Sequence, residues 1–210
     1  MSAVKNNQLI KIASEGLWYN NPIFRQVLGI CSTLAVTNLV INTVVMCAGL
    51  VFALTCSTVT VSLIRNITPK NIRMMVETLI MAFYVIIIDL VLRAYWPDMS
   101  RQLGPYVGLI ITNCILMGRI EAYGITNPPR KAFLDGLFNA LGYSFILIII
   151  ASFREVLGMG TFMGIAVPYF SSQMWDKWII MVMPPGGFFM LAILTWIFRS
   201  MQVQKEVKKA

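Results

Sequence analysis

The sequence predicts an all-α integral membrane protein with six transmembrane helices. Of its 210 residues, 58% are hydrophobic and only 12% are charged, about half the charged fraction of a soluble domain. The mean hydropathy is +0.73, and apolar runs near the ~20 residues needed to cross a bilayer recur along the whole length. No cleavable signal peptide is visible, because residues 1–21 carry Lys5, Lys11 and Glu15 but no apolar core.

The first three predicted helices differ in how continuous their apolar runs are. The span from about 23 to 39 is short and is interrupted by Gly29. The span from about 40 to 64 is long and rich in Val, Leu and Thr. The span from about 72 to 95 is the most aliphatic, and Trp96-Pro97 at its exit is typical of an anchor at the membrane interface.

The last three predicted helices carry more interruptions. The span from about 103 to 118 holds two glycines and a Thr-Asn-Cys tripeptide, whose amide must find a partner because lipid offers none. The span from about 132 to 153 is long and aliphatic. In the span from about 178 to 199, Pro184-Pro185-Gly186-Gly187 should kink or break the first turns. The basic tail that begins at Arg199 is expected to be disordered.

The distribution of basic residues predicts the orientation in the membrane. With six spans both termini lie on one side, and thirteen of the 17 Lys and Arg residues fall on that side, against four on the other. The positive-inside rule then places both termini in the cytoplasm. Since the basic residues flank the membrane spans, the net charge of +8 does not indicate a nucleic-acid partner.

Two weakly similar halves suggest an inverted repeat. Arg25-Gln26 and Arg101-Gln102 each precede a short glycine-containing segment, and Thr37-Asn38 and Thr112-Asn113 follow at nearly equal spacing. Three spans per half force opposite orientations, a plan in which short interrupted helices meet near the midplane. The predicted organisation is a cytoplasmic segment 1–21, a membrane domain 22–200 with repeats at about 22–96 and 98–200, and a basic cytoplasmic tail 201–210.

The four cysteines divide into two pairs. Cys47 and Cys56 lie nine residues apart on one predicted helix, about half a turn out of phase, so they cannot converge on one metal. Cys31 and Cys114 each lie in the short interrupted segment of their own half, where an inverted repeat can bring them together. Two thiolates are half of the usual set for an iron–sulfur cluster. Either these two cysteines are structural, or a partner chain supplies two more.

Intramembrane carboxylates are the other candidate site residues, because the chain has no histidine. Asp89 lies among Ile, Leu and Val, where a carboxylate is costly unless it is paired or hydrated; it marks an ion pathway or a structural pair. Asp135 lies one turn inside its helix, where it can stabilise the N-terminus. The remaining charged residues are expected to be structural: Glu77 paired with Arg73, Arg65, Arg73 and Arg119 as interfacial anchors, and Arg154-Glu155 as a local pair at the outer face.

Several stretches resemble one family of respiratory membrane subunits. They are Asn20-Asn21-Pro22, Val27 to Ser32, Ser62 to Asn66, Gly108 to Ala122 with its Thr-Asn-Cys core, and Phe153 to Gly160. These stretches resemble the family formed by the D-type membrane component of the sodium-translocating NADH:quinone reductase and the E-type membrane component of the Rnf ferredoxin:NAD complex, over roughly residues 18–200. No nucleotide-binding loop is present, so NADH and flavins would bind to other subunits.

The resemblance implies a function for the candidate residues. It implies a six-helix subunit of a bacterial inner-membrane complex, paired with a sister subunit of like fold and opposite orientation. Cys31 and Cys114 match positions that share an intramembrane [2Fe–2S] cluster with two cysteines of the sister subunit, and Asp89 and Asp135 match acidic positions implicated in sodium passage. The quinone reductase is favoured, with the Rnf complex, a stand-alone secondary transporter and a bare scaffold as alternatives.

Overall fold

The computed structural model describes residues 28–163, 165, 166, 180 and 183–207 of the 210-residue chain. The predicted cytoplasmic segment 1–21 and the beginning of the first predicted span lie outside this part. The regular secondary structure of the described chain is helical except for two short antiparallel strands, β1 (Thr161–Phe162) and β2 (Ile165–Ala166). The all-α prediction is therefore confirmed for the described residues apart from this small hairpin.

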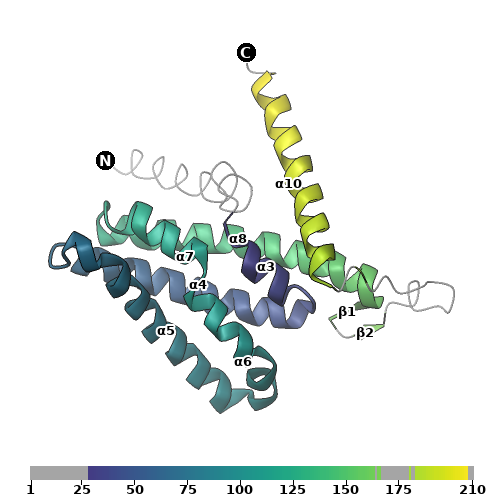
Figure 1. The fold of residues 1–210 in the computed structure, drawn as a ribbon, viewed down its shortest axis with the longest axis horizontal. Helices are drawn as coiled ribbons and strands as arrows, with labels where there is room; N and C mark the ends of the chain where they lie inside the picture. The colour runs from purple at the N-terminus through teal and green to yellow at the C-terminus, as the bar shows by residue number, and fades with distance from the viewer. Residues whose placement is uncertain (1–27, 164, 167–179, 181–182, 208–210) are drawn as a thin grey trace, which may run out of the picture.

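Two long helices, α4 (Val40–Ile64) and α8 (Pro129–Met159), form the centre of the fold. They pack along one another, as Figure 1 shows. The close approach depends on Gly136, where a Cβ would lie 2.7 Å from Thr58 Oγ1 of α4. The span predicted at 40–64 is confirmed, whereas α8 extends beyond 132–153 at both ends, because Pro129 starts it and Gly160, at φ 68°, ends it.

Helices α5 and α6 form a hairpin against one side of this pair. A 3₁₀ turn, η2 (Lys70–Ile72), leads into α5 (Arg73–Tyr95), and Trp96 separates α5 from α6 (Pro97–Ile111). Only 17% of the most apolar window of α5 is buried, against 56% for α4 and α8. An apolar helix with so little of its surface covered faces lipid or another membrane subunit.

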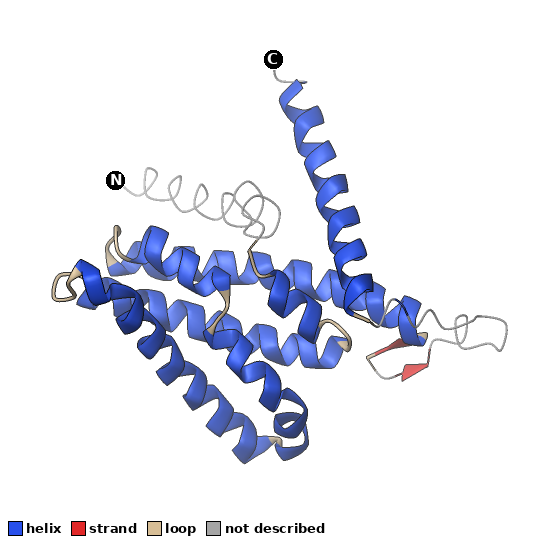
Figure 2. Ribbon diagram, viewed as in Figure 1, coloured by secondary structure: helices blue, strands red, loops and turns tan. Residues whose placement is uncertain are grey.

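The predicted span at 103–118 is not one helix. α6 ends at Ile111, and α7 (Cys114–Arg119) begins two residues later and runs into a π-helical turn, η3 (Ile120–Gly124). The break arises because the Asn113 side chain accepts a hydrogen bond from Ile115 N at 3.1 Å and so caps a new helix. Figure 2 shows this break as a loop between helical segments.

The first half contains a matching short helix, α3 (Ile30–Val36), which follows Gly29 and ends before the turn at Thr37. The Thr-Asn pairs used to relate the halves are therefore not equivalent, since Thr37-Asn38 follows a short helix and Thr112-Asn113 precedes one. Gly29 instead takes the place before α3 that Asn113 takes before α7. Cys31 and Cys114 are the second and first residues of these two short helices.

Arg154 and Glu155 of α8 hold the turn between α3 and α4. The Arg154 guanidinium donates to Leu34 O and Thr37 Oγ1 at the end of α3, and to Met183 O. Glu155 Oε2 accepts from Val40 N at 2.7 Å and caps α4. The two charges thus complement the C-terminus of one helix and the N-terminus of the next. Sequence reasoning placed this pair at the outer face, but both side chains are buried.

The end of α4 holds the second half in a similar way. Arg65 Nη1 donates to Ile125 O, just after η3, and Ser62 Oγ donates to Asn127 O at 2.7 Å. Arg65 was predicted to be an interfacial anchor, yet here it also joins two parts of the chain. Each of the two central helices therefore fixes the end of the short helical segment that belongs to the other half.

The last helix, α10 (Pro184–Val207), leaves the bundle at its first turns (Figure 1). Its two prolines stand where α10 starts rather than kinking it, and the helix continues through most of the tail that was predicted to be disordered. Of the described helical stretches, four are long and apolar enough to cross a membrane, and α10 is not one of them. They are Val40–Ile64, Lys70–Tyr95, Pro97–Gly124 and Pro129–Met159.

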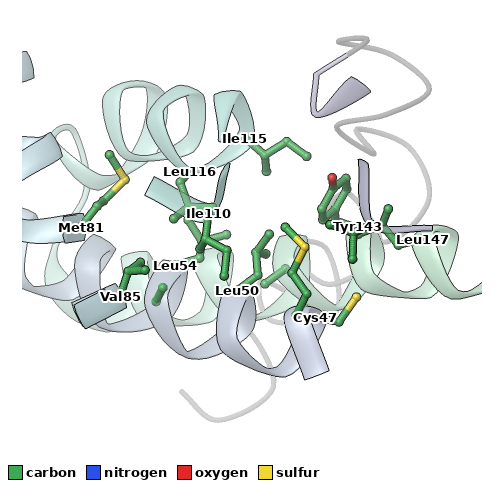
Figure 3. Close-up of a cluster of buried hydrophobic side chains, with 14 of the residues drawn as sticks. Cys47, Leu50, Leu54, Met81, Val85, Ile110, Ile115, Leu116, Tyr143 and Leu147 are labelled. Atoms are coloured by element: carbon green, nitrogen blue, oxygen red, sulfur yellow. The ribbon is translucent and has the colours of Figure 1, made fainter. Parts of the chain in front are cut away.

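The buried apolar core lies where α4, α5, α6, α7 and α8 meet. Figure 3 shows Leu50 and Leu54 of α4 in the middle of this cluster, with Met81 at one end and Tyr143 at the other. All four side chains are fully buried. The core therefore extends from Met81 of α5 to Tyr143 of α8.

Candidate functional site

Cys31 and Cys114 lie at the starts of the two short helices, and both are exposed free thiols. Cys31 is the second residue of the seven-residue helix α3, and Cys114 is the first residue of α7 after the break that ends α6. All four cysteines are free in the described chain. An exposed thiol on an apolar subunit is available to a group or a chain outside it.

A buried hydrogen bond joins the two cysteine-bearing segments. Asn113 Nδ2 donates to Ser32 Oγ at 3.3 Å, and each of these residues is adjacent in sequence to one of the two cysteines. Sequence reasoning predicted that Cys31 and Cys114 come together across the two halves, and this bond places their immediate neighbours in contact. It also supplies the partner that the Asn113 amide was expected to require.

Tyr143 of α8 completes this connection. Its hydroxyl lies 2.5 Å from Ser32 Oγ and donates to Gly29 O at 3.2 Å, while the ring is fully buried. Sequence reasoning missed Tyr143. The available signal was a phenol within an aliphatic run of α8, because a buried tyrosine hydroxyl usually finds a hydrogen-bond partner.

Gly29 is the tightest point of the site. Its φ of 82° lies in the left-handed region, and a Cβ there would stand 2.7 Å from Ile115 Cδ1 and 2.9 Å from the Tyr143 hydroxyl. Ile115 is the residue after Cys114. The backbone that turns into the first short helix is thus packed directly against the second short helix.

Cys47 and Cys56 do not take part in this arrangement. Cys47 is buried on α4, with its thiol 3.9 Å from Ser144 O, and Cys56 is half-buried on the same helix. Both lie on α4, away from the two short helices that carry Cys31 and Cys114. Within the described residues no group of three or more His, Cys, Asp or Glu side chains can hold a metal ion, so Cys31 and Cys114 offer only two thiol ligands.

The two candidate ion-pathway residues have different surroundings. Asp89 Oδ2 forms an ion pair with Arg93 Nε of its own helix at 2.8 Å, near the exposed end of α5. The sequence analysis left open whether Asp89 marks an ion pathway or belongs to a structural pair. Arg93 gives Asp89 an ion-pair partner on the same helix. Asp135 is instead buried between α7 and α8.

Asp135 is held by two side chains. Arg119, the last residue of α7, binds the carboxylate with both Nε and Nη2, the Nε–Oδ2 distance being 3.2 Å. Asn139 Nδ2 donates to Asp135 Oδ1 at 3.0 Å and to Asp135 O at 2.8 Å. Arg119 was predicted to be an interfacial anchor, and that prediction is wrong, because its guanidinium turns inward to pair with Asp135.

A second group of charges is structural, as predicted. Arg73 Nε lies 3.9 Å from Glu77 Oε1, one turn along α5. Arg73 also pairs with Glu121 of η3, which sequence reasoning did not anticipate. This group joins the beginning of α5 to the π-helical turn after α7.

The chain has relatives that cover nearly its whole length. A family model described as Rnf-Nqr subunit, membrane protein, matches residues 9–195. A protein of Tolumonas auensis is 40% identical over 205 residues, which is 96% of this chain and 94% of the relative. A protein of Photobacterium profundum is 45% identical over 193 residues, which is 90% of this chain and 92% of the relative.

A protein of Psychromonas ingrahamii is 42% identical over 200 residues, 94% of this chain and 95% of the relative. All three relatives are named as the D-type component of the Na(+)-translocating NADH-quinone reductase, so they are subunits of an ion-translocating oxidoreductase. The resemblance drawn from the sequence motifs is thereby confirmed. The chain belongs to the Rnf-Nqr family of membrane protein subunits.

Proposed function

We propose that this chain is the D-type membrane component of a sodium-translocating NADH:quinone reductase. We further propose that Cys31 and Cys114 provide two of the four ligands of an intramembrane [2Fe–2S] cluster, with two cysteines of a sister subunit providing the others. The observation that carries the cluster assignment is the Ser32–Asn113 hydrogen bond, which joins the residues next to two exposed free thiols.

The residues present fit a shared cluster. Thiolates are the usual protein ligands of iron–sulfur clusters, and both thiols are exposed rather than sealed in the core. The chain offers two thiol ligands here, so a second subunit must cover this surface and complete the set. When bound, the cluster accepts and releases one electron.

The chain's own residues give the two thiols a fixed relation. Asn113 and Gly29 set the starts of α7 and α3, and the Tyr143 hydroxyl ties the loop at Gly29 to α8. The apolar core excludes water from the inner side of this arrangement. The role of this chain is to hold two of the cluster ligands in fixed positions, since the residues that contact metal ligands determine their orientation.

The names of the relatives support the quinone reductase over the Rnf complex, because the three compared relatives carry that name. In this function NADH and flavins bind to other subunits, and the cluster passes electrons across the bacterial inner membrane while sodium is exported. Both termini would lie in the cytoplasm, as the distribution of Lys and Arg favours.

The proposed architecture has six spans in two inverted repeats. Its support is the shared order of elements: α3 precedes the long helix α4 in one half, and α7 with η3 precedes the long helix α8 in the other. The bonds from Arg154 and Arg65 add a reciprocal feature, since each holds the end of the other half's short helical segment. Helix α10 would take the last of the six places.

Purification of the subunit alone and within the complex tests this function. The chain purified with its sister subunit is expected to carry two iron atoms and an EPR signal of a reduced [2Fe–2S] cluster, whereas the chain purified alone lacks both. The reason is that the chain supplies only half of the ligands. A full complement of iron in the chain alone, or none in the complex, would contradict the shared cluster.

A further inference from the structure

Two arginines line one cavity beside the turn that joins α5 to α6. The cavity has a volume of about 410 Å³ and is lined by Arg93, Pro97, Ser100, Arg101 and Gly104, and this volume is within the range of small-molecule sites. At Gly104 the wall leaves free space, because a Cβ there would meet nothing within 4 Å beyond its chain neighbours and the nearby backbone of its own helix. The predicted orientation assigns only four of the 17 Lys and Arg residues to this side of the membrane, and two of those four meet in this cavity.

Both guanidinium groups have hydrogen-bond donors to offer in this cavity. Arg93 uses Nε for its ion pair with Asp89, while the side chain is 66% exposed, so its two terminal nitrogens remain available. Arg101 is exposed and forms no ion pair with another described residue. Asp98, in the first turn of α6, does not line the cavity. The two arginines and Asp89 together leave one net positive charge, which matches the single negative charge of a phosphate diester.

An exposed apolar stripe runs along α5 from Arg93 into the membrane. Residues three and four positions apart share one face of a helix, and at this spacing before Arg93 the chain has Leu90, Ile86, Phe83 and Leu79, whose exposed fractions range from 55% to 70%. From Arg93 to Phe83 the helix rises about 15 Å, which is half of the ~30 Å hydrocarbon core of a bilayer. A lipid whose headgroup lies at Arg93 would therefore have an acyl chain along this stripe through one leaflet.

We propose that the cavity binds the phosphate of an anionic phospholipid in the leaflet opposite the termini, and that the stripe packs against one acyl chain of the same lipid. Guanidinium groups bind phosphate through paired N–H donors, and basic pockets between membrane helices bind anionic headgroups. The side chains of the stripe are all large, whereas contacts between membrane helices favour Gly, Ala, Ser and Thr. The stripe therefore suits a lipid chain better than a neighbouring helix. This site is independent of the proposed cluster.

Photolabelling of the assembled complex tests this site. The complex is placed in phosphatidylcholine nanodiscs with a trace of phosphatidylglycerol that carries a diazirine in its acyl chain, and labelled peptides are identified by mass spectrometry. We expect label on α5 between Phe83 and Leu90, which excess unlabelled phosphatidylglycerol removes and inorganic phosphate does not. Arg101→Gln should reduce this label roughly fivefold, the usual contribution of one basic residue to anionic-lipid binding at a membrane surface. Arg199→Gln is the matched control, because Arg199 is an exposed arginine of α10 outside the cavity and its replacement should leave the label unchanged.

Each other outcome would overturn the lipid site. Equal label in the unmodified and Arg101→Gln complexes, or equal label from a phosphatidylcholine probe, would mean that lipid covers the stripe without using the arginines. No label on α5 in the unmodified complex would mean that another subunit covers the stripe. Removal of the label by inorganic phosphate would mean that the cavity takes free phosphate. The cluster is judged separately, by iron content and EPR signal, so either proposal can fail while the other stands.

Discussion

Replacing Cys114 by alanine in the assembled complex is expected to remove the EPR signal of one [2Fe–2S] cluster and two iron atoms per complex. Electron flow from NADH to quinone should fall to background at the same time, because a cluster that lacks one of four thiolate ligands is not retained in an exposed position. Cys31→Ala is expected to give the same result. Iron analysis, EPR and quinone reduction by the purified variants provide the measurement.

The control for this prediction is Cys56→Ala. Cys56 is a half-buried thiol on α4, and nothing in the described structure joins it to the two short helices. The same substitution there should leave iron, EPR signal and turnover at the level of the unmodified complex. Equal iron content in the Cys114→Ala and Cys56→Ala variants would contradict the proposed ligand role.

Replacing Gly29 by alanine is expected to destabilise the subunit by about 2–5 kcal/mol. The left-handed backbone costs an L-residue about 1–2 kcal/mol, and a Cβ 2.7 Å from Ile115 Cδ1 adds overpacking of about 1–3 kcal/mol. The clash lies between the two cysteine-bearing segments, so the retained cluster should also show an altered EPR line shape. Thermal unfolding of the complex and EPR of the same preparation measure both effects.

Gly104→Ala is the matched control, because a Cβ at that position in α6 would meet no described atom within 4 Å beyond its chain neighbours and the nearby backbone of its own helix. Alanine is about 1 kcal/mol more favourable than glycine inside a helix, so this variant should be as stable as the unmodified subunit or slightly more stable. If Gly29→Ala and Gly104→Ala behaved alike, the close packing between the two short helices would be refuted.

Continuous apolar runs made the long helices predictable. The span at 40–64 agrees with α4 at both ends, and the span at 72–95 agrees with α5 within one residue. The break at Asn113 was not predicted as a helix start, because apolar runs continue on both sides of Thr112-Asn113 and the cap forms only through the Asn113 side chain. Hydropathy records burial in lipid but not a change of helix axis.

The candidate site was predictable in part for a related reason. A cysteine in an interrupted segment is visible in sequence, which is why Cys31 and Cys114 were singled out. The structure places them as the second residue of α3 and the first residue of α7. The partners of those segments, Tyr143 and Arg154, come from a helix more than a hundred residues away from α3. Contacts over such a separation depend on how the central helices pack. The pattern of residues in a single sequence does not reveal that packing.

The same limit explains Arg119. An arginine after a short apolar run is typical of an interfacial anchor, and the sequence offers no sign that the chain turns its side chain inward. The inward direction follows from the start of α7 at Cys114, which places Arg119 beside α8. Because the helix break before Cys114 was not predicted, the pairing of Arg119 with Asp135 was not predicted either.

A density map of the assembled complex provides the most direct measurement of the central claim, which is that this chain contributes half of a shared cluster. We predict metal density in contact with the sulfur atoms of Cys31 and Cys114 and with two sulfur atoms of a neighbouring subunit. A map in which these two thiols contact only lipid or apolar side chains, with no metal density between the subunits, would contradict it.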